Sequence, residues 1–370
     1  EIVFGDWSSD VCSSDLRFMM RELEPLYRRS LMVLADLIGA QQHDLVFVPN
    51  ATHGVNAVVR SLSFREGDEI LTTNHDYYAV RNTLQLVAQR SGARVVVAEV
   101  PFPLSDEQEV VQAIREKIST RTRLAVIDHV TSPTALIFPV QQIVRLLQER
   151  DIDVLIDGAH APGMIPLDVE KIGAAYYTGN CHKWLCAPKG AGFLWVRPDR
   201  QELIHPPVSS YTRFSSYSLT PFQLEFYWAG TLDPTAYLSV GKAIGYMQSL
   251  LEKGWPGIMK RNRDLLIQAR RHYCATLSQA PSCPEQMLGS MAALELPAGD
   301  VVGPLPAFYM DALQERLISD YGIQVPIMMW PGPPQRLVRF SAQLYNDLPH
   351  YEKLTRSEEH TSELQSPNTI

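Results

Sequence analysis

The sequence predicts an α/β fold, in which a large domain with a mainly parallel β-sheet between helices is followed by a small α+β domain. Two observations carry this prediction. From Arg17 onward, short apolar stretches alternate with amphipathic stretches, which is typical of a buried parallel sheet wound with helices. The chain has 370 residues, of which 45% are hydrophobic and 20% charged, so it can form cores for two domains.

Seven short apolar stretches are predicted strands of the large domain. They are rich in β-branched and aromatic residues, and polar or small residues follow them. In chain order they span 44–49, 68–74, 93–100, 123–130, 153–160, 174–180 and 191–197.

The amphipathic stretches between these strands are predicted helices. The first stops at Gly39, and the second begins near Asn50, a residue type that caps helices. The predicted helices of the large domain span 21–40, 50–62, 77–92, 107–119, 140–150 and 235–254.

A smaller unit follows the last of these helices. We therefore expect a large domain at residues 17–250 and a small domain at 251–355. The small domain has predicted helices at 257–277 and 308–322 and predicted strands at 291–297 and 335–343.

The two ends of the chain are expected to be sequencing artefacts rather than native protein. Residues 356–366, RSEEHTSELQS, back-translate with permitted codons to a DNA string that looks like a sequencing-library adaptor. Its reverse complement, read one base in, encodes DWSSDVCSSDL, which is residues 6–16. We expect residues 1–16 and 356–370 to be non-native, and both adaptor-derived stretches to be exposed with few tertiary contacts.

Charge and cysteine content narrow the class of protein. The net charge is −8, of which −5 lies in the adaptor-derived stretches (−3 and −2), and a negative charge argues against nucleic acid as the main partner. No apolar run reaches the roughly 20 residues of a membrane span. Five scattered cysteines indicate a reducing, cytoplasmic location. Because the native N-terminus is expected to be missing, the absence of a signal peptide carries no conclusion.

Polar residues follow the predicted strands at the edge where such sheets bind ligands, beyond the carboxyl ends of the strands. Together they offer a helix start for an anion, an aromatic ring, hydroxyls, a carboxylate, imidazoles and an amine. These residues are Asn50-Ala51-Thr52, Asn74-His75-Asp76-Tyr77, Thr131-Ser132, Asp157-Gly158-Ala159-His160 and Asn180-Cys181-His182-Lys183.

This set of groups matches the chemistry of pyridoxal phosphate. The helix that opens at Asn50 can bind a phosphate, and Tyr77 can stack on a flat ring. Asp157 can pair with a protonated ring nitrogen, and Lys183 can form a Schiff base with an aldehyde. A lysine in an otherwise buried stretch is avoided unless it is paired or chemically useful.

The chain resembles the class V aminotransferase family of fold type I pyridoxal-phosphate enzymes, in the branch of isopenicillin N epimerase, with cysteine desulfurases as more distant relatives. The resemblance implies the aspartate aminotransferase-like fold with a seven-stranded sheet, pyridoxal phosphate as cofactor and an amino acid as substrate. The motifs that carry it lie in order within residues 50–346: NATHGVNAVVRSL, NHDYYA, DHVTSPTALIFPV, IDGAHAPG, GNCHKWLCAPKGAGFLWVR, WAGTLDPTA and VRFSAQLYN.

The resemblance also implies a role for each matching residue. Lys183 would form the aldimine and, once freed, remove the α-proton, while Asp157 would pair with the pyridine nitrogen. Tyr77 would stack on the ring, and Arg339 would bind the substrate α-carboxylate. The other implied contacts are Ser132 and His160 with the phenolic oxygen of the ring, Ala51, Thr52, Asn180 and His182 with the phosphate, and Thr231 with the phosphate of the partner subunit in a homodimer.

Taken singly, several of these residues have structural explanations. Asp157 could be a strand-end turn residue, Tyr77 a core aromatic and Arg339 a surface ion-pair partner. A zinc site is the alternative at Cys181, His182 and Cys186, but that cluster lacks a convincing fourth ligand, so no metal is expected. The structural explanations do not account for all candidates falling at strand ends in this order.

The reaction outcome stays open between epimerisation, transamination and loss of a β-substituent. The leading hypothesis is an epimerase-like or aminotransferase-like enzyme that acts through α-proton abstraction. A C–S lyase on a sulfur-substituted amino acid is the alternative, and a catalytically idle cofactor-binding homologue is the alternative of another class. Cysteine desulfurase chemistry is disfavoured because residues 322–340, ahead of and including Arg339, contain no cysteine, and Cys283 lies far upstream.

Overall fold

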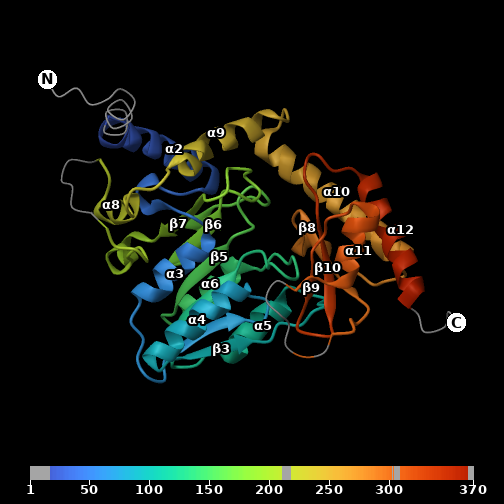
Figure 1. Cartoon of the computed structure of the whole chain (residues 1–370). Helices are drawn as coiled ribbons and strands as arrows, with labels where there is room; N and C mark the ends of the chain where they lie inside the picture. The colour runs from blue at the N-terminus through green and yellow to red at the C-terminus, as the bar shows by residue number, and fades with distance from the viewer. Residues whose placement is uncertain (1–16, 211–217, 302, 304–308, 366–370) are drawn as a thin grey trace.

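The large domain is built on a seven-stranded sheet. The computed structural model describes residues 17–210, 218–301, 303 and 309–365 (Figure 1). The strand order is β1-β7-β6-β5-β4-β2-β3, with β7 antiparallel to both neighbours and the other pairs parallel, which confirms the predicted fold class. The strands are β1 Leu45–Val48, β2 Glu69–Thr73, β3 Arg94–Ala98, β4 Thr122–Asp128, β5 Asp153–Gly158, β6 Tyr176–Asn180 and β7 Gly192–Val196.

Each face of this sheet packs on its own set of helices. Helices α3, α4 and α8 share one buried cluster with the sheet, and α2, α5, α6, α7 and α9 share the other. Two buried apolar faces explain why the strands are apolar throughout. These helices are α2 Leu23–Ile38, α3 Ala51–Ser61, α4 Tyr78–Ser91, α5 Gln108–Lys117, α6 Val140–Gln148, α7 Val169–Ile172, α8 Pro221–Tyr227 and α9 Thr235–Ser249.

The small domain has an antiparallel sheet with the order β8-β10-β9. Strand β9 was not predicted because it is only three residues long. The helix predicted at 235–254 ends at Ser249, and the next begins at Gly254. The elements are α10 Gly254–Thr276, β8 Met291–Leu296, α11 Ala312–Tyr321, β9 Ile327–Met329, β10 Arg336–Ser341 and α12 Leu348–Gln365.

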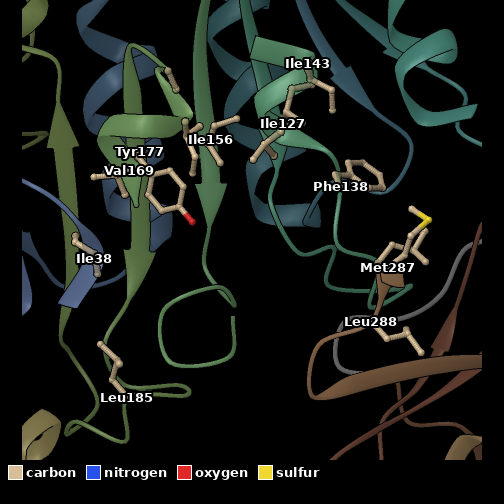
Figure 2. Close-up of a cluster of buried hydrophobic side chains, with 14 of the residues drawn as sticks. Ile38, Ile127, Phe138, Ile143, Ile156, Val169, Tyr177, Leu185, Met287 and Leu288 are labelled. Carbon is tan, nitrogen blue, oxygen red and sulfur yellow. The ribbon is translucent and has the colours of Figure 1, made fainter. Parts of the chain in front are cut away.

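The small domain is joined to the sheet by a segment just before β8. The Ile137 amide donates a hydrogen bond to the Met287 carbonyl, 2.8 Å away. Figure 2 shows Met287 and Leu288 in the same hydrophobic cluster as Phe138 and Tyr177. This contact holds β8 and β10 near the loop that follows β4.

The C-terminal stretch that is expected to be adaptor-derived is not exposed throughout, contrary to the prediction. Residues 6–16 lie outside the described residues, whereas 356–365 continue α12 as a helix. Tyr351 and Leu354 of α12 are buried in the core, and Ser357 one turn on is only 2% exposed. The helix is anchored before the stretch begins, and most of the residue types that follow are compatible with helix, so it continues.

In the described part of the chain, no helix is long and apolar enough to cross a membrane.

Candidate active site

The candidate site lies at the carboxyl ends of β5 and β6, on the face of the sheet that α3 covers. Side chains alternate between the two faces along a strand. Leu155 and Tyr176 belong to the cluster shared with α3. Asp157, two residues after Leu155, and Asn180, four after Tyr176, therefore point to the same face. Lys183 follows directly on the loop after β6.

The N-terminus of α3 is fixed on this edge by a hydrogen bond to β6. The Ala51 amide donates to Asn180 Oδ1 over 2.9 Å, and both residues are buried. Helix α3 approaches the sheet closely at Gly54, where a Cβ atom would lie 2.1 Å from Thr178 Oγ1. Any larger residue at Gly54 would push the helix start away from Asn180.

Three of the predicted phosphate contacts, Ala51, Thr52 and Asn180, are brought together, but they are not equivalent. The Ala51 amide is already used by Asn180, and the His53 amide donates to Asn50. The Thr52 amide has no hydrogen-bond partner among the described residues, so it is the free donor of this helix start. A phosphate would therefore be held mainly by Thr52 and by the remaining amide hydrogens of Asn180.

His182 lies on the loop after β6, two residues beyond Asn180. Its Nδ1 is 2.8 Å from the Ala191 carbonyl and must donate to it, because a carbonyl only accepts. In the neutral ring, Nε2 is then an acceptor. Burial lowers the pKa of His182, so its ring favours the neutral form in this structure. It would donate to a phosphate only after taking up a proton, which the phosphate charge itself favours.

Lys183 contacts His160. Its Nζ lies 3.0 Å from His160 Nε2, and His160 is 7% exposed. Burial, followed by the charges of Lys183 and Arg339, lowers the pKa of His160 well below its ordinary value, so the ring stays neutral. When Lys183 is charged it donates to Nε2, and Nδ1 then carries the ring proton. That Nδ1 has no partner in the described part of the chain.

Burial is also the main influence on the Lys183 amine. It lowers the pKa of the amine to about 8, against the opposing attraction of Asp157. An amine with this pKa is largely available as a nucleophile and base in mildly alkaline solution. Lys183, the lysine that the sequence places in an otherwise buried stretch, therefore has an amine suited to act as a nucleophile or a base.

Asp157 is 3% exposed and accepts a hydrogen bond from the Ala159 amide over 2.9 Å. Burial raises the pKa of this carboxyl, while the Ala159 amide and the charge of Lys183 oppose the rise. A buried carboxylate beside a lysine is suited to pair with a cationic ring nitrogen.

Arg339 on β10 reaches across from the small domain to the loop after β4. Its Nη1 donates to the Ser132 carbonyl and lies 3.2 Å from Ser132 Oγ. Its Nε has no partner among the described residues although the atom is buried. Ser132, predicted to contact the ring, therefore also positions the guanidinium.

A cavity of about 700 Å³ connects Lys183, His160 and Arg339. Cys186 and Gln343 also line it. It lies between the large sheet and β10, so both domains contribute walls. This volume is in the range of small-molecule sites.

Two predicted contacts lie at the surface of the described chain. Tyr77 immediately precedes α4 and is 47% exposed. Thr231 is exposed on the loop between α8 and α9. The exposed loop position of Thr231 is what a contact to a partner subunit would require.

The sequence analysis missed three residues near the site. Asp128 ends β4 next to Asp157, and it was overlooked because that strand was predicted to run to residue 130. Cys186 was considered only as a metal ligand, and Gln343 was not considered. The rule that ligands bind at strand ends, applied at the observed end of β4, two residues before the predicted one, would have found Asp128.

The aminotransferase class-V family model matches residues 4–272. The chain belongs to this family. It is therefore a pyridoxal-phosphate-dependent enzyme, and the predicted family, fold class and cofactor are confirmed.

Relatives within the family differ in their reactions. The chain is 30% identical to a probable L-cysteine desulfhydrase, chloroplastic, of Arabidopsis thaliana, over 94% of this chain and 77% of the relative. It is 31% identical to an isopenicillin N epimerase of Streptomyces clavuligerus, over 90% of this chain and 84% of the relative.

Solved structures support the fold. A cysteine desulfurase from Thermococcus onnurineus superposes with a TM-score of 0.73 at 21% identity, covering 91% of this chain and 84% of that chain. A complex of the cystine C–S lyase C-DES gives a TM-score of 0.74 at 18% identity, covering 91% and 86%. At these identities the likeness concerns the fold alone.

The residues present fit pyridoxal phosphate. The site offers an unpaired helix-start amide at Thr52, a buried carboxylate at Asp157 and an amine of lowered pKa at Lys183. His160 Nδ1 and Arg339 Nε are buried without partners among the described residues. Buried polar atoms in this state are costly in the free protein and are satisfied by a polar ligand.

Proposed function

We propose that the chain holds pyridoxal phosphate at Lys183 and removes the α-proton of an amino acid whose carboxylate binds Arg339. The observation that carries this proposal is the cavity shared by Lys183, His160 and Arg339. Lys183, the proposed base, and Arg339, the proposed carboxylate-binding cation, line one space from different domains, which supports the proposal.

The bound cofactor draws electrons from the α-carbon of an amino acid joined to it, which makes the α-proton acidic. Lys183 would take that proton on its amine. His160, neutral and 3.0 Å away, orients the amine through Nε2. Asp157 would hold positive charge at the ring nitrogen, since it is a buried carboxylate with Lys183 nearby.

Arg339 would orient the substrate. A guanidinium binds a carboxylate through two parallel hydrogen bonds. Ser132 holds Nη1, which leaves Nε free to turn toward the cavity. The phosphate would be held by Thr52 and Asn180, with His182 as a further donor once it is protonated, and Tyr77 would cover the ring.

Proton exchange at the α-carbon tests this proposal. The enzyme loaded with pyridoxal phosphate should exchange the α-proton of at least one amino acid of a panel in heavy water, followed by proton NMR. Lys183→Ala should abolish exchange, whereas Lys189→Ala, which changes an exposed lysine six residues along, should not. Full exchange by Lys183→Ala would refute the assigned base.

A C–S lyase is a second candidate outcome. Desulfhydrases are among the relatives near 30% identity, together with the epimerases. Loss of sulfide after α-proton removal needs no nucleophilic cysteine, in agreement with the cysteine-free segment 322–340. Sulfide and pyruvate released from L-cysteine would support this outcome, and inversion of the substrate without sulfide would support an epimerase.

The further proposals concern assembly and location. We infer a homodimer in which Thr231 reaches the phosphate site of the partner subunit, supported by the exposed position of the Thr231 loop. We also infer a cytoplasmic location, supported by the scattered cysteines, which are free in the described chain.

A further inference from the structure

Asp128 and Asp157 are opposite each other on neighbouring parallel strands. They are register partners of β4 and β5. Leu124 and Val126 of β4 belong to the same buried cluster as Leu155 of β5. Because side chains alternate along a strand, the two carboxyl groups point to the same face, toward the site. Their residues are 5% and 3% exposed.

The carboxyl groups near this pair differ in the donors and cations that stabilise them. Asp76, beyond the end of β2, is held by Arg81 through hydrogen bonds of 2.7 and 2.9 Å. Asp157 accepts a hydrogen bond from the Ala159 amide, and the charge of Lys183 acts on it. Strand β4, which ends at Asp128, lies between β5 and β2 in the sheet.

No other side chain in the described residues donates a hydrogen bond to the Asp128 carboxyl group, and its own backbone amide has the smallest influence on its pKa. The charged groups that act on it are Asp157 from β5, Asp76 from the loop after β2 and Lys183 from the loop after β6. Two of these three are carboxylates, so the surroundings of Asp128 disfavour a negative charge.

Two adjacent buried carboxyl groups do not both ionise at neutral pH when the nearby donors and cations offset the desolvation and repulsion of only one of them. Burial, followed by the charge of Asp157, raises the pKa of Asp128 well above its ordinary value. Burial raises the pKa of Asp157 too, but the next influences on it, the Ala159 amide and the charge of Lys183, favour its negative charge, whereas on Asp128 the two carboxylates outweigh Lys183. The proton therefore belongs on Asp128.

We propose that Asp128 is a positioning residue of the cofactor site, which holds the proton of the carboxyl pair so that Asp157 carries the one negative charge facing the pyridine nitrogen. This inference rests on the proposed function, because it assigns Asp157 to that nitrogen. It predicts that an amide can replace Asp128 but not Asp157, since an amide has the shape of a protonated carboxyl group.

The cofactor-free protein gives the first test. A carboxyl group with a raised folded pKa binds more protons folded than unfolded, so its cost to stability appears as the pH rises above the unfolded pKa. Asp128→Asn should therefore raise the Tm at about pH 8 and much less at about pH 4. Asp68→Asn is the control of opposite sign. The Arg65 amide donates to this carboxyl group over 2.8 Å and lowers its pKa, so this variant should lower the Tm at about pH 8 and much less at about pH 4.

Cofactor affinity gives the second test. Asp128→Asn should bind pyridoxal phosphate within about threefold of the wild type, and Asp157→Asn should lose more than about tenfold, the loss expected for one buried charge. An equal loss in both variants, or a larger loss in Asp128→Asn, would overturn the inference. A pH-independent change of Tm in Asp128→Asn would also overturn it.

Two further outcomes have a defined meaning: failure of Asp128→Asn to fold, and failure of the wild type to bind the cofactor. If Asp128→Asn does not fold, infrared spectra of the wild type and of Asp128→Ser decide the question, because the wild type at neutral pH should show a protonated-carboxyl band that Asp128→Ser lacks. The presence of that band in both would contradict the assignment. Failure of the wild type to bind pyridoxal phosphate would instead defeat the proposed function.

Discussion

The Lys183 amine is in direct contact with the His160 imidazole, with Nζ 3.0 Å from Nε2. Burial keeps the imidazole neutral and lowers the pKa of the amine to about 8. The contact therefore joins a neutral acceptor to a lysine that releases its proton more readily than usual. This pair is the centre of the proposed site, and its charge state has consequences for stability.

Lys183→Met should stabilise the cofactor-free protein at neutral pH. The wild-type lysine is charged in both the folded and the unfolded state below about pH 8, and its burial then costs on the order of 3 kcal/mol. As the pH rises through about 8 toward 10.5, the folded chain loses the proton and the cost shrinks.

Urea unfolding midpoints measured at neutral and alkaline pH check this prediction. The advantage of Lys183→Met should be largest at neutral pH, while the control Lys189→Met should change little at either pH. A variant less stable than the wild type at neutral pH would contradict the lowered lysine pKa.

Arg339→Lys should raise KM roughly tenfold or more with a smaller change in kcat, because an ammonium replaces a planar two-point donor. Steady-state kinetics on an amino acid identified by the exchange assay measure this. Arg261→Lys, an exposed arginine on α10, is the control and should leave KM unchanged. An unchanged KM in Arg339→Lys would remove Arg339 from the carboxylate site.

Asn180→Asp tests whether Asn180 binds the phosphate in addition to holding the start of α3 through the Ala51 amide. An aspartate keeps an acceptor for the Ala51 amide, so the fold of α3 should persist. Its charge would repel the phosphate, so the affinity for pyridoxal phosphate should fall by more than about tenfold while that for pyridoxal stays similar. Isothermal titration with both compounds measures this. Equal losses for both compounds would show that Asn180 acts on the fold rather than on the phosphate.

Thr231→Ala tests the proposed subunit interface. The variant should keep the Tm of the cofactor-free protein and lose cofactor faster on gel filtration, because Thr231 is exposed and its contact is assigned to the partner's phosphate. Light scattering on the same samples gives the oligomeric state. A monomer that retains the cofactor as well as the wild-type dimer would defeat this assignment.

Much of the fold could be predicted from the sequence because both faces of the large sheet are buried. Continuous apolar strands such as Leu45–Val48 leave little ambiguity about the strands. The antiparallel placement of β7 could not be predicted, since strand direction is set by tertiary pairing. Short elements such as Ile327–Met329 give too little periodicity to be recognised.

Residues of the candidate site could be named from the sequence where a chemically suitable side chain falls in a recognisable motif. Contacts that depend only on tertiary packing could not be predicted. Lys183, His160 and Arg339 were named from motifs, and the structure places them around one cavity. The use of the Ala51 amide by Asn180 depends on how closely α3 approaches β6. The pairing of Asp128 with Asp157 depends on the register between two strands. Neither distance nor register is encoded in a local pattern.

The covalent position of the cofactor tests the central claim most directly. Borohydride reduction of the enzyme loaded with pyridoxal phosphate converts the imine to a stable amine, which fixes the cofactor on the lysine that carries it. Peptide mass spectrometry should then find the phosphopyridoxyl group on Lys183, and Lys183→Ala should carry none. The group on another lysine, with Lys183 unmodified, would contradict the account.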